Sequence, residues 1–409
     1  MAHEVDIAVV GAGAAGLGAA RRLAEANASF VVLEARGRVG GRTQTVRPWA
    51  DLPIDLGAEW LHSADRNPLA QRFAAAGLEI DRTPSHWTRQ TGGRHFPADD
   101  QAAFRRAYAA LEDRLEAAAD AGREGRASDH LEPDGRWNPL LDAVSGYYNG
   151  AELDQVSVLD YGAYVDTGKN WRLPGGYGAA LAGLAAGDIR LGCAVRRIDH
   201  RGARIRLVAD AGDVSARAVI VTLPTPILAR QDVAFDPPLP QKVEAASGLP
   251  LGLADKVFIA LDEPEALPVE GHLFGDPHSA LTGSYHTRPF GRPLIEAYLG
   301  GRRAEGLEPA GAAAMQAFAM EQLCGQLGSD FARRARPIVS TAWRADPLAL
   351  GSYSHALPGH AGDRARLAAP VDDRLFFAGE ATSPEFFSTV HGAWISGERA
   401  ADEALAALR

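Results

Sequence analysis

Apolar and polar residues at the start of the chain follow the order strand, helix, strand. Residues 5–10 (VDIAVV) form a short apolar, β-branched run that predicts a buried strand. An alanine-rich stretch with leucines on one side comes next and predicts a helix that ends near Asn27. Residues 29–33 are apolar again and predict a second strand, which ends on Glu34. The first predicted unit is therefore two strands joined by a helix.

From about residue 79 the pattern changes. Residues 99–121 place apolar side chains at helical spacing and predict a long amphipathic helix, whose stripe we expect to pack in a core (Phe104, Tyr108, Leu111, Leu115). Residues 87–96 predict a hairpin around two glycines. A Pro-Gly-Gly break then precedes a small-residue stretch that predicts a helix over residues 177–186.

Strand patterns return in two groups and in the tail. The first group is residues 194–198, 204–208 and 218–223, and the second is residues 255–261, 271–274, 280–286 and 294–299. Residues 312–327 predict a helix that buries its apolar side chains. In the tail, LFFAGEAT (residues 375–382) predicts a buried strand, and a last helix begins near Thr389.

Three glycines end the first predicted strand in a G-x-G-x-x-G arrangement: Gly11, Gly13 and Gly16. This spacing lets the chain turn sharply, lets a pyrophosphate approach the backbone, and lets the helix pack on the strand. The start of that helix offers unpaired N–H groups and a positive dipole end to the pyrophosphate. Glu34 stands about where a carboxylate accepts hydrogen bonds from an adenosine ribose. Both NAD and FAD fit these features.

A second glycine turn favours FAD. Gly40, Gly41 and Arg42 follow Glu34 closely, which suits a longer, two-phosphate cofactor that lies inside the protein. The next motif, LPIDLGAEWLHS (residues 52–63), places polar and aromatic groups just after Gly57. So close to the cofactor turn, they predict a wall of the site, although a surface loop held by a tryptophan is the alternative.

The length and the order of these patterns predict two domains, because 409 residues exceed the size at which one core stops growing. We expect an α/β (α+β) fold with a Rossmann-type FAD-binding domain in three segments, residues 1–78, 174–240 and 346–409. The inserted segments, residues 79–173 and 241–345, are expected to form a substrate-binding domain with a mixed sheet and helices. The pattern contains no internal repeat.

Composition narrows the choice of partners. The net charge of −10 argues against nucleic acid and mildly favours cationic ligands, although a solvated acidic surface explains it equally well. The two cysteines, Cys193 and Cys324, have neither disulfide-framework nor metal-ligand spacing, so no metal site is indicated. No apolar run approaches the ~18 residues of a membrane span. The first predicted strand leaves no room for a signal peptide, so we expect a cytoplasmic protein.

Motifs along nearly the whole chain carry a resemblance to a known family. They are VVGAGAAGLGAA, LEARGRVGGR and DLGAEWLH near the start, LPGGYG, ARAVIVTLP and DKVFI in the middle, and WRADPLALGSYSH, LFFAGEAT and TVHGAWISGERAA in the tail. In this order they resemble the flavin-dependent amine oxidase family, which includes monoamine oxidases, polyamine oxidases and histone lysine demethylases. The demethylases' long helical insertion does not fit in this length, so a chromatin role is not expected.

The resemblance implies a set of FAD contacts. Glu34 would bind the ribose, Val195 the adenine through its backbone, and Glu380 the ribityl–pyrophosphate region. The full set is Gly11, Gly13, Ala15, Gly16, Glu34, Arg36, Gly40, Gly41, Arg42, Gly57, Ala58, Val195, Gly379, Glu380, Thr389 and Val390. Covalently flavinylated members carry cysteine where this chain has Ser352, which implies non-covalent FAD.

The resemblance also implies catalytic residues. Lys256 matches the lysine that holds a water against flavin N5, whereas a lone lysine in a strand is otherwise expected at an edge, facing solvent. Tyr353 matches one of the two rings between which monoamine oxidases hold the amine, and Thr389 stands at the position of the other ring. His62 stands where polyamine oxidases place an ionisable residue near the flavin.

The predicted function is oxidation of a polyamine such as spermine, spermidine or an acetylated form. Hydride transfer to the flavin would give an imine that hydrolyses to an aldehyde and a shortened amine, and molecular oxygen would yield hydrogen peroxide. Glu59, Trp60 and Ser388 would complete the substrate pocket, with Glu59 as a candidate partner for a second substrate ammonium. The alternatives are oxidation of an amino acid, a monoamine or a cyclic alkaloid amine, a flavin-dependent desaturase, and a flavoprotein without turnover.

Overall fold

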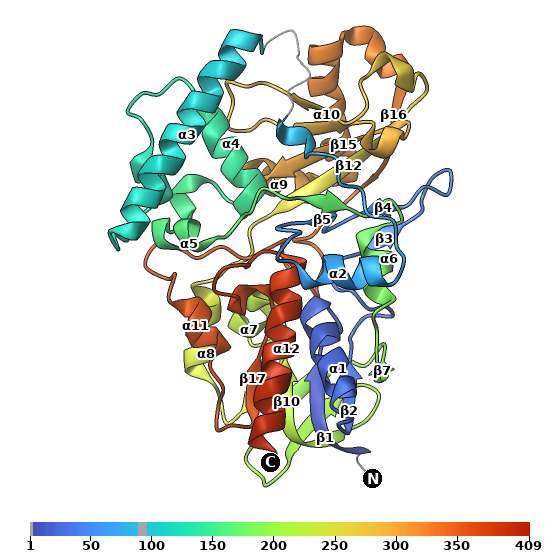
Figure 1. Ribbon diagram of the computed structural model, residues 1–409, viewed down its shortest axis with the longest axis vertical. Coiled ribbons are helices and arrows are strands. Elements are labelled where there is room, and N and C mark those ends of the chain that lie inside the picture. Colours follow the sequence, from blue (N-terminus) through green and yellow to red (C-terminus); the bar gives the residue numbers. More distant parts are fainter. Residues whose placement is uncertain (1–2, 89–95) are drawn as a thin grey trace.

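The computed structural model describes residues 3–88 and 96–409. Two sheets dominate the fold, one toward each end of the long axis in Figure 1. The N-terminal strand and the C-terminal helix lie at the same end, around the larger sheet (Figure 1). Among the described helices, none is both long enough and apolar enough to cross a membrane.

The larger sheet has eight strands in the order β11-β8-β9-β10-β1-β2-β7, with β17 also paired to β10. Strand β1 pairs in parallel with β2 and β10, as expected for strands joined by helical crossovers. The strand β9 is antiparallel to both of its neighbours. The strands are β1 (His3–Val10), β2 (Phe30–Leu33), β7 (Asp188–Arg190), β8 (Val195–Asp199), β9 (Ile205–Ala209), β10 (Val214–Val221), β11 (Ala234–Asp236) and β17 (Leu375–Phe377).

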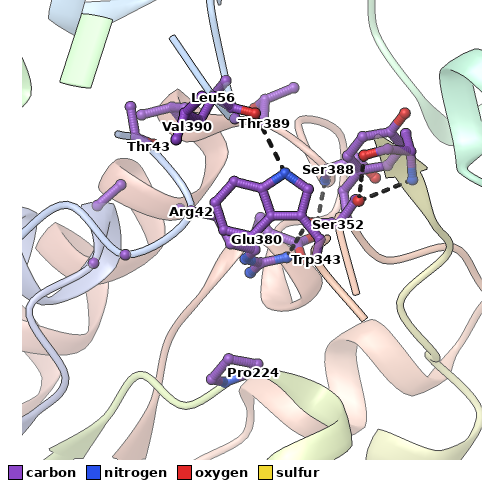
Figure 2. A pocket seen from close by; sticks show the side chains of 18 of the residues that line it. Arg42, Thr43, Leu56, Pro224, Trp343, Ser352, Glu380, Ser388, Thr389 and Val390 are labelled. Carbon is purple, nitrogen blue, oxygen red and sulfur yellow. Dashed lines mark hydrogen bonds and ion pairs between the residues drawn. The ribbon is translucent and has the colours of Figure 1, made fainter. Parts of the chain in front are cut away.

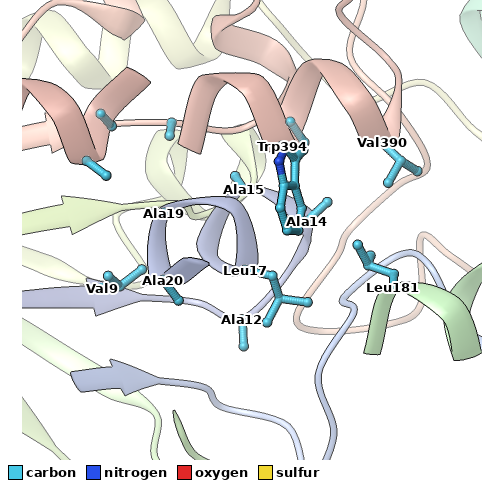
Figure 3. Packing of buried hydrophobic residues seen from close by; sticks show 14 of the residues in the cluster. Val9, Ala12, Ala14, Ala15, Leu17, Ala19, Ala20, Leu181, Val390 and Trp394 are labelled. Carbon is cyan, nitrogen blue, oxygen red and sulfur yellow. The ribbon is translucent and has the colours of Figure 1, made fainter. Parts of the chain in front are cut away.

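Two helices from opposite ends of the chain, α1 (Ala14–Glu25) and α12 (Val390–Ala407), pack closely on this sheet. A Cβ added at Gly18 would lie 2.5 Å from the Trp394 carbonyl oxygen, and one at Gly397 would lie 1.9 Å from the Ala15 carbonyl oxygen. Figure 3 shows the buried Trp394 side chain reaching from α12 toward the start of α1. Small residues therefore allow a close approach that fixes the start of α12 beside the glycine turn.

The second sheet has five antiparallel strands in the order β13-β14-β15-β12-β16. They are β12 (Ala254–Leu261), β13 (Gly271–Phe274), β14 (Ser284–Thr287), β15 (Leu294–Gly300) and β16 (Ala335–Ser340). The strand β12 lies between two neighbours, and all its residues are buried. The helices of this half are α3 (Ala98–Asp120), α4 (Asn138–Asn149), α5 (Val158–Ala163), α9 (Gly301–Leu307) and α10 (Ala312–Leu327).

Two short strand pairs and further helices complete the described part of the fold. The pairs are β3 (Thr45–Val46) with β4 (Ile54–Asp55) and β5 (Trp60–Leu61) with β6 (Trp171–Arg172). The remaining helices are α2 (Pro68–Ala75), α6 (Tyr177–Ala182), α7 (Thr225–Ala229), α8 (Pro240–Ser247) and α11 (Asp363–Ala368). Strand β5 matters for the site because it carries Trp60 and leads to His62.

The predicted fold class is confirmed, and the departures are local. The helix predicted over residues 177–186 ends at Ala182, and the strand predicted from residue 280 begins at Ser284. Most of the predicted hairpin at residues 87–96 lies outside the described residues, and a 3₁₀ turn covers His86–Thr88. The larger sheet draws all its strands from the three segments predicted for the FAD-binding domain, although the domain boundaries themselves stay a prediction.

Candidate active site

A cavity of about 1090 Å³ is lined by residues from both sheets. That volume lies just above the usual range of small-molecule sites, about 300–1,000 Å³. The cavity brings together the predicted site residues with the exception of Gly16: Gly11, Gly13, Ala15, Glu34, Arg36, Gly40, Gly41, Arg42, Gly57, Ala58, Glu59, Trp60, His62, Val195, Lys256, Tyr353, Gly379, Glu380, Ser388, Thr389 and Val390. The predicted cofactor and substrate residues thus share one space.

The glycine turn between β1 and α1 forms a cradle at one end of the cavity. Gly11 has a φ of +100°, a conformation that favours glycine. A Cβ at Gly13 would meet nothing within 4 Å, so this backbone is open to a ligand. A Cβ at Gly16 would lie 1.9 Å from the Gly11 carbonyl oxygen, so Gly16 allows the turn to close without lining the cavity itself. The first N–H groups of α1 are left for an anion.

Two backbone N–H groups hold the Glu34 carboxylate beside this cradle. Ala12 donates to Oε2 and Arg36 donates to Oε1, each at 2.7 Å. Each oxygen keeps a second lone pair that a ribose hydroxyl can use. The Arg36 guanidinium also lines the cavity, but its two nitrogens donate to Asp346, each at 2.9 Å, so its charge is balanced within the protein.

A buried glutamate anchors the middle of the cavity. Arg42 donates to Glu380 Oε1 at 3.0 Å and to the Ser352 carbonyl at 2.6 Å, and the Ser388 N–H donates to Glu380 Oε2 at 2.9 Å (Figure 2). Burial alone would raise the pKa of Glu380, but the Arg42 charge and a bond from Ser354 outweigh it and lower that pKa. The ionised Glu380 thus fixes Arg42 beside the cofactor cradle.

Helix α12 begins at the cavity, and Thr389 is its N-cap. The Thr389 hydroxyl accepts from the Gly392 N–H at 3.0 Å and donates to the Phe386 carbonyl at 2.6 Å. The Ser388 hydroxyl donates to the Ser354 carbonyl at 2.5 Å. Both hydroxyls donate to backbone carbonyls, so Thr389 positions the start of the helix; its role in catalysis stays a prediction. The uncapped N–H groups of the first turn favour nearby negative charge.

The residues present fit FAD. The open backbone at Gly13, the Glu34 carboxylate, Val195 of β8 and the start of α12 all line one cavity, as the phosphates, ribose, adenine and flavin of that cofactor require. Figure 2 shows the Trp343 indole in this region, where its N–H donates to the Leu56 carbonyl at 3.3 Å. The Ser352 hydroxyl accepts a hydrogen bond from the Ala254 N–H and donates one to the Ala254 carbonyl, each at 2.9 Å. FAD is therefore held non-covalently.

Lys256 occupies the interior of β12, where it is 4% exposed, and not a sheet edge. Its Nζ lies 2.7 Å from Glu296 Oε1 and 3.1 Å from Glu59 Oε2, and it donates to the Asp55 carbonyl at 3.2 Å. Burial alone would lower the pKa of Lys256, but the two carboxylates outweigh it and raise that pKa, so the ammonium stays charged. Sequence reasoning missed Glu296, because only the β12–β15 register brings it to Lys256.

Glu59 lines the cavity, but its charge is shared by two cations. Besides Lys256, Arg172 NH1 lies 3.6 Å from Glu59 Oε1. Burial would raise the pKa of Glu59, but Lys256 and Arg172 outweigh it and lower that pKa to about 2. A second substrate ammonium would meet a carboxylate that already contacts two protein cations, and the role of Glu59 as its partner stays a prediction.

A second buried cluster lies behind Glu59, and no sequence motif predicts it. Arg172 NH2 lies 2.7 Å from Glu270 and 2.9 Å from Asp81. Glu270 Oε2 also contacts the His286 Nε2 at 2.7 Å, and the His86 ring stacks on His286 with centroids 3.8 Å apart. These residues are far apart in the sequence, and no local motif links them.

Aromatic side chains and one histidine complete the substrate end. Trp60 packs edge-on against Trp87 at 4.5 Å between centroids, and the Tyr353 hydroxyl lies 3.0 Å from that of Tyr298. His62 Nδ1 lies 2.8 Å from the amide oxygen of Asn170, which only accepts, so Nδ1 carries the proton. Burial lowers the pKa of His62, and the hydrogen bond to Asn170 raises it by less, so the ring is neutral at pH 7.

Comparison with known proteins decides the family. The sequence profile described as flavin containing amine oxidoreductase matches residues 14–405. The chain belongs to this family. It is therefore an oxidoreductase that uses FAD.

Polyamine oxidases are among the similar curated proteins. Polyamine oxidase 4 of Oryza sativa subsp. japonica is 31% identical over 98% of this chain and 89% of its own length. The lysine-specific histone demethylase 1 homolog 2 of the same organism is 30% identical over 98% of this chain but only 57% of its own. A solved structure of putrescine oxidase bound to putrescine shares the fold, with a TM-score of 0.80, 20% identity, and coverage of 99% of this chain and 100% of its own.

Proposed function

We propose that this family member oxidises a polyamine at a carbon next to an amine nitrogen. When bound, FAD supplies the hydride acceptor, and with molecular oxygen as the final acceptor the products are an aldehyde, a shortened amine and hydrogen peroxide. The single observation that carries the proposal is the shared cavity, which joins the cofactor cradle to Lys256, His62 and Tyr353. The polyamine oxidases among the relatives support this substrate class.

The protein residues have separate tasks in this proposal. The charged Lys256 is held by two carboxylates and would orient a water beside the flavin. The rings of Trp60, Trp87 and Tyr353 would enclose the substrate carbon chain and exclude water. Neutral His62, with its proton on Nδ1, keeps Nε2 as an acceptor for a substrate N–H. None of these groups needs to become a nucleophile.

The ion pairs in the cavity favour a polyamine whose distal part is neutral, such as an acetylated form. Among the described residues at the substrate end, the lining carboxylates are Glu59 and Glu296, and both contact Lys256. A second ammonium would find aromatic rings there but no carboxylate without a cation. The same observation favours a monoamine as the second candidate, because it too carries one charge.

Product analysis tests the proposal. The holoenzyme is mixed in air with spermine, spermidine, N1-acetylspermidine, benzylamine and an amino acid, and peroxide and aldehyde are quantified. We expect peroxide and aldehyde in equal amounts, fastest from a polyamine. Peroxide fastest from benzylamine would favour the monoamine candidate. Failure of every amine to give peroxide would contradict the proposal.

A further inference from the structure

Glu296 is a buried carboxylate at the substrate end that the sequence motifs do not include. It lies on β15, is 8% exposed, and lines the cavity. Its Oε1 atom is 2.7 Å from Lys256 Nζ, which also contacts Glu59. One ammonium is therefore shared by two carboxylates that both line the space where the substrate amine would lie.

The groups that face Glu296 come from several elements. Lys256 of β12 and Glu59, which precedes β5, both face Glu296. His286 occupies the paired position on β14, and Tyr298 lies two residues further along β15. Donor atoms of Glu59, His286 and Glu296 all lie within 4.8 Å of one another, and Lys256 already supplies a cation there. Behind them lie Arg172, Glu270 and Asp81, with His86 stacked on His286.

The charge balance of this buried cluster is negative. Its two permanent cations, Lys256 and Arg172, face the four carboxylates of Asp81, Glu59, Glu270 and Glu296. Uncompensated charge is costly in a buried site, so the cluster tends to retain a proton. Burial and the Glu59 charge raise the pKa of Glu296, and the Lys256 charge lowers it by less, so the pKa is about 8. The raised pKa distinguishes Glu296 from Glu59, the other carboxylate that contacts Lys256, whose pKa is lowered.

We propose that Glu296 accepts the proton of the substrate ammonium before oxidation, while Lys256, itself held by Glu59, keeps the Glu296 carboxylate in place. The inference rests on the proposed function. An N–H bond of R–CH₂–NH₃⁺ breaks, an O–H bond forms on Glu296, and the products are R–CH₂–NH₂ and a neutral carboxylic acid. No electrons change hands in this step. The proton returns to solvent before the next turnover.

Its neighbours are poorer acceptors. The low pKa of Glu59 makes it a weak base, and Lys256 already carries its proton. A proton acceptor works best when its pKa lies near the working pH, which singles out Glu296 in this cluster. His62 is the competing acceptor, because it is neutral and lines the same cavity.

The main test is the pH dependence of anaerobic flavin reduction by N1-acetylspermidine, followed by stopped-flow absorbance from pH 6 to 10. In the wild type we expect the rate to rise to a plateau with an apparent pKa near 8. Glu296→Gln should lower the rate at least tenfold and remove this ionisation, whereas Glu296→Asp should keep an ionisation and recover part of the rate. Glu321→Gln, on the exposed face of α10, is the matched control and should match the wild type.

A second measurement does not depend on amine oxidation. In the infrared spectrum of the substrate-free holoenzyme, one protonated carboxyl band should disappear as the pH rises through 8, and the band should be missing in Glu296→Gln. The absence of a difference between the two proteins would overturn the inference, as would an unchanged pH profile in Glu296→Gln or an ionisation lost only in His62→Asn. If no amine reduces the wild-type flavin, the proposed function itself fails, and the inference fails with it. If Glu296→Gln does not fold, the test uses the pH profile of Glu296→Asp and the infrared carboxyl band of the wild type.

Discussion

Replacing Lys256 with methionine removes the one cation that the two carboxylates share. Methionine keeps the length of the side chain in the fully buried strand β12, so the change is chiefly electrostatic. Glu59 keeps Arg172 at 3.6 Å, but among the described contacts Glu296 has no other cation within ion-pair distance. The Lys256→Met variant therefore leaves a buried carboxylate without a counter-charge.

The expected cost is large. Removing one partner of a buried ion pair destabilises a protein by about 3–5 kcal/mol, because the other charge stays desolvated. Protonation of Glu296 relieves part of this cost at low pH. A carboxyl group whose pKa is higher in the folded than in the unfolded protein stabilises the fold when it is protonated. This stabilisation is complete below the pKa of the unfolded state and is lost as the pH rises through the pKa of the folded state. Each such proton changes the unfolding free energy by about 1.4 kcal/mol per pH unit.

The assay is urea unfolding of the FAD-loaded protein by circular dichroism at pH 6 and pH 9. We expect Lys256→Met to lower the midpoint at both values and more at pH 9, with the double variant Lys256→Met/Glu296→Gln partly restored. Lys169→Met, which breaks an exposed pair with Asp65, is the control and should leave the midpoint unchanged. A Lys256→Met midpoint equal to that of the wild type at pH 9 would refute the stabilising contacts of Lys256 with Glu59 and Glu296.

Three further predictions follow from the site. Acid precipitation should release all the FAD into the supernatant, because Ser352 offers no thiol; flavin that stays with the polypeptide would contradict this. Gly16→Ala should abolish FAD binding in absorbance titrations of the refolded protein, because its Cβ would lie 1.9 Å from the Gly11 carbonyl oxygen; near-normal affinity would show that the turn tolerates a side chain. His62→Asn should keep FAD but slow amine-dependent flavin reduction at least tenfold, or about 1.4 kcal/mol of barrier; an unchanged rate would leave His62 a wall residue only.

Local patterns explain why the cofactor half of the site could be predicted from the sequence. The cradle depends on neighbours within one strand–turn–helix unit, so the spacing of Gly11, Gly13 and Gly16 already contains its geometry. Glu34 follows from the same unit, because it ends the next parallel strand. The amphipathic helix at Ala98–Asp120 and the helix at Ala312–Leu327 were predictable for the same reason, since their periodicity lies within one segment.

The substrate half depends on contacts between distant segments. Glu296 meets Lys256 only through the antiparallel register of β12 and β15, and Arg172 reaches Glu59 through the β5–β6 pair. No local pattern encodes these registers, so the sequence named Glu59 as a candidate partner for a substrate ammonium without the cations that contact it. The cap that Thr389 forms on α12 likewise becomes visible only when the helix start is located.

The most direct test of the account is anaerobic mixing of the holoenzyme with single amines while the flavin absorbance is followed. We expect N1-acetylspermidine to bleach the flavin fastest, spermidine and spermine to follow, and benzylamine to be much slower. We also expect the fastest rate to rise between pH 7 and pH 9, since the reacting nitrogen must lose its proton. Faster bleaching by benzylamine or an amino acid than by every polyamine, or a rate that is flat across this range, would contradict it.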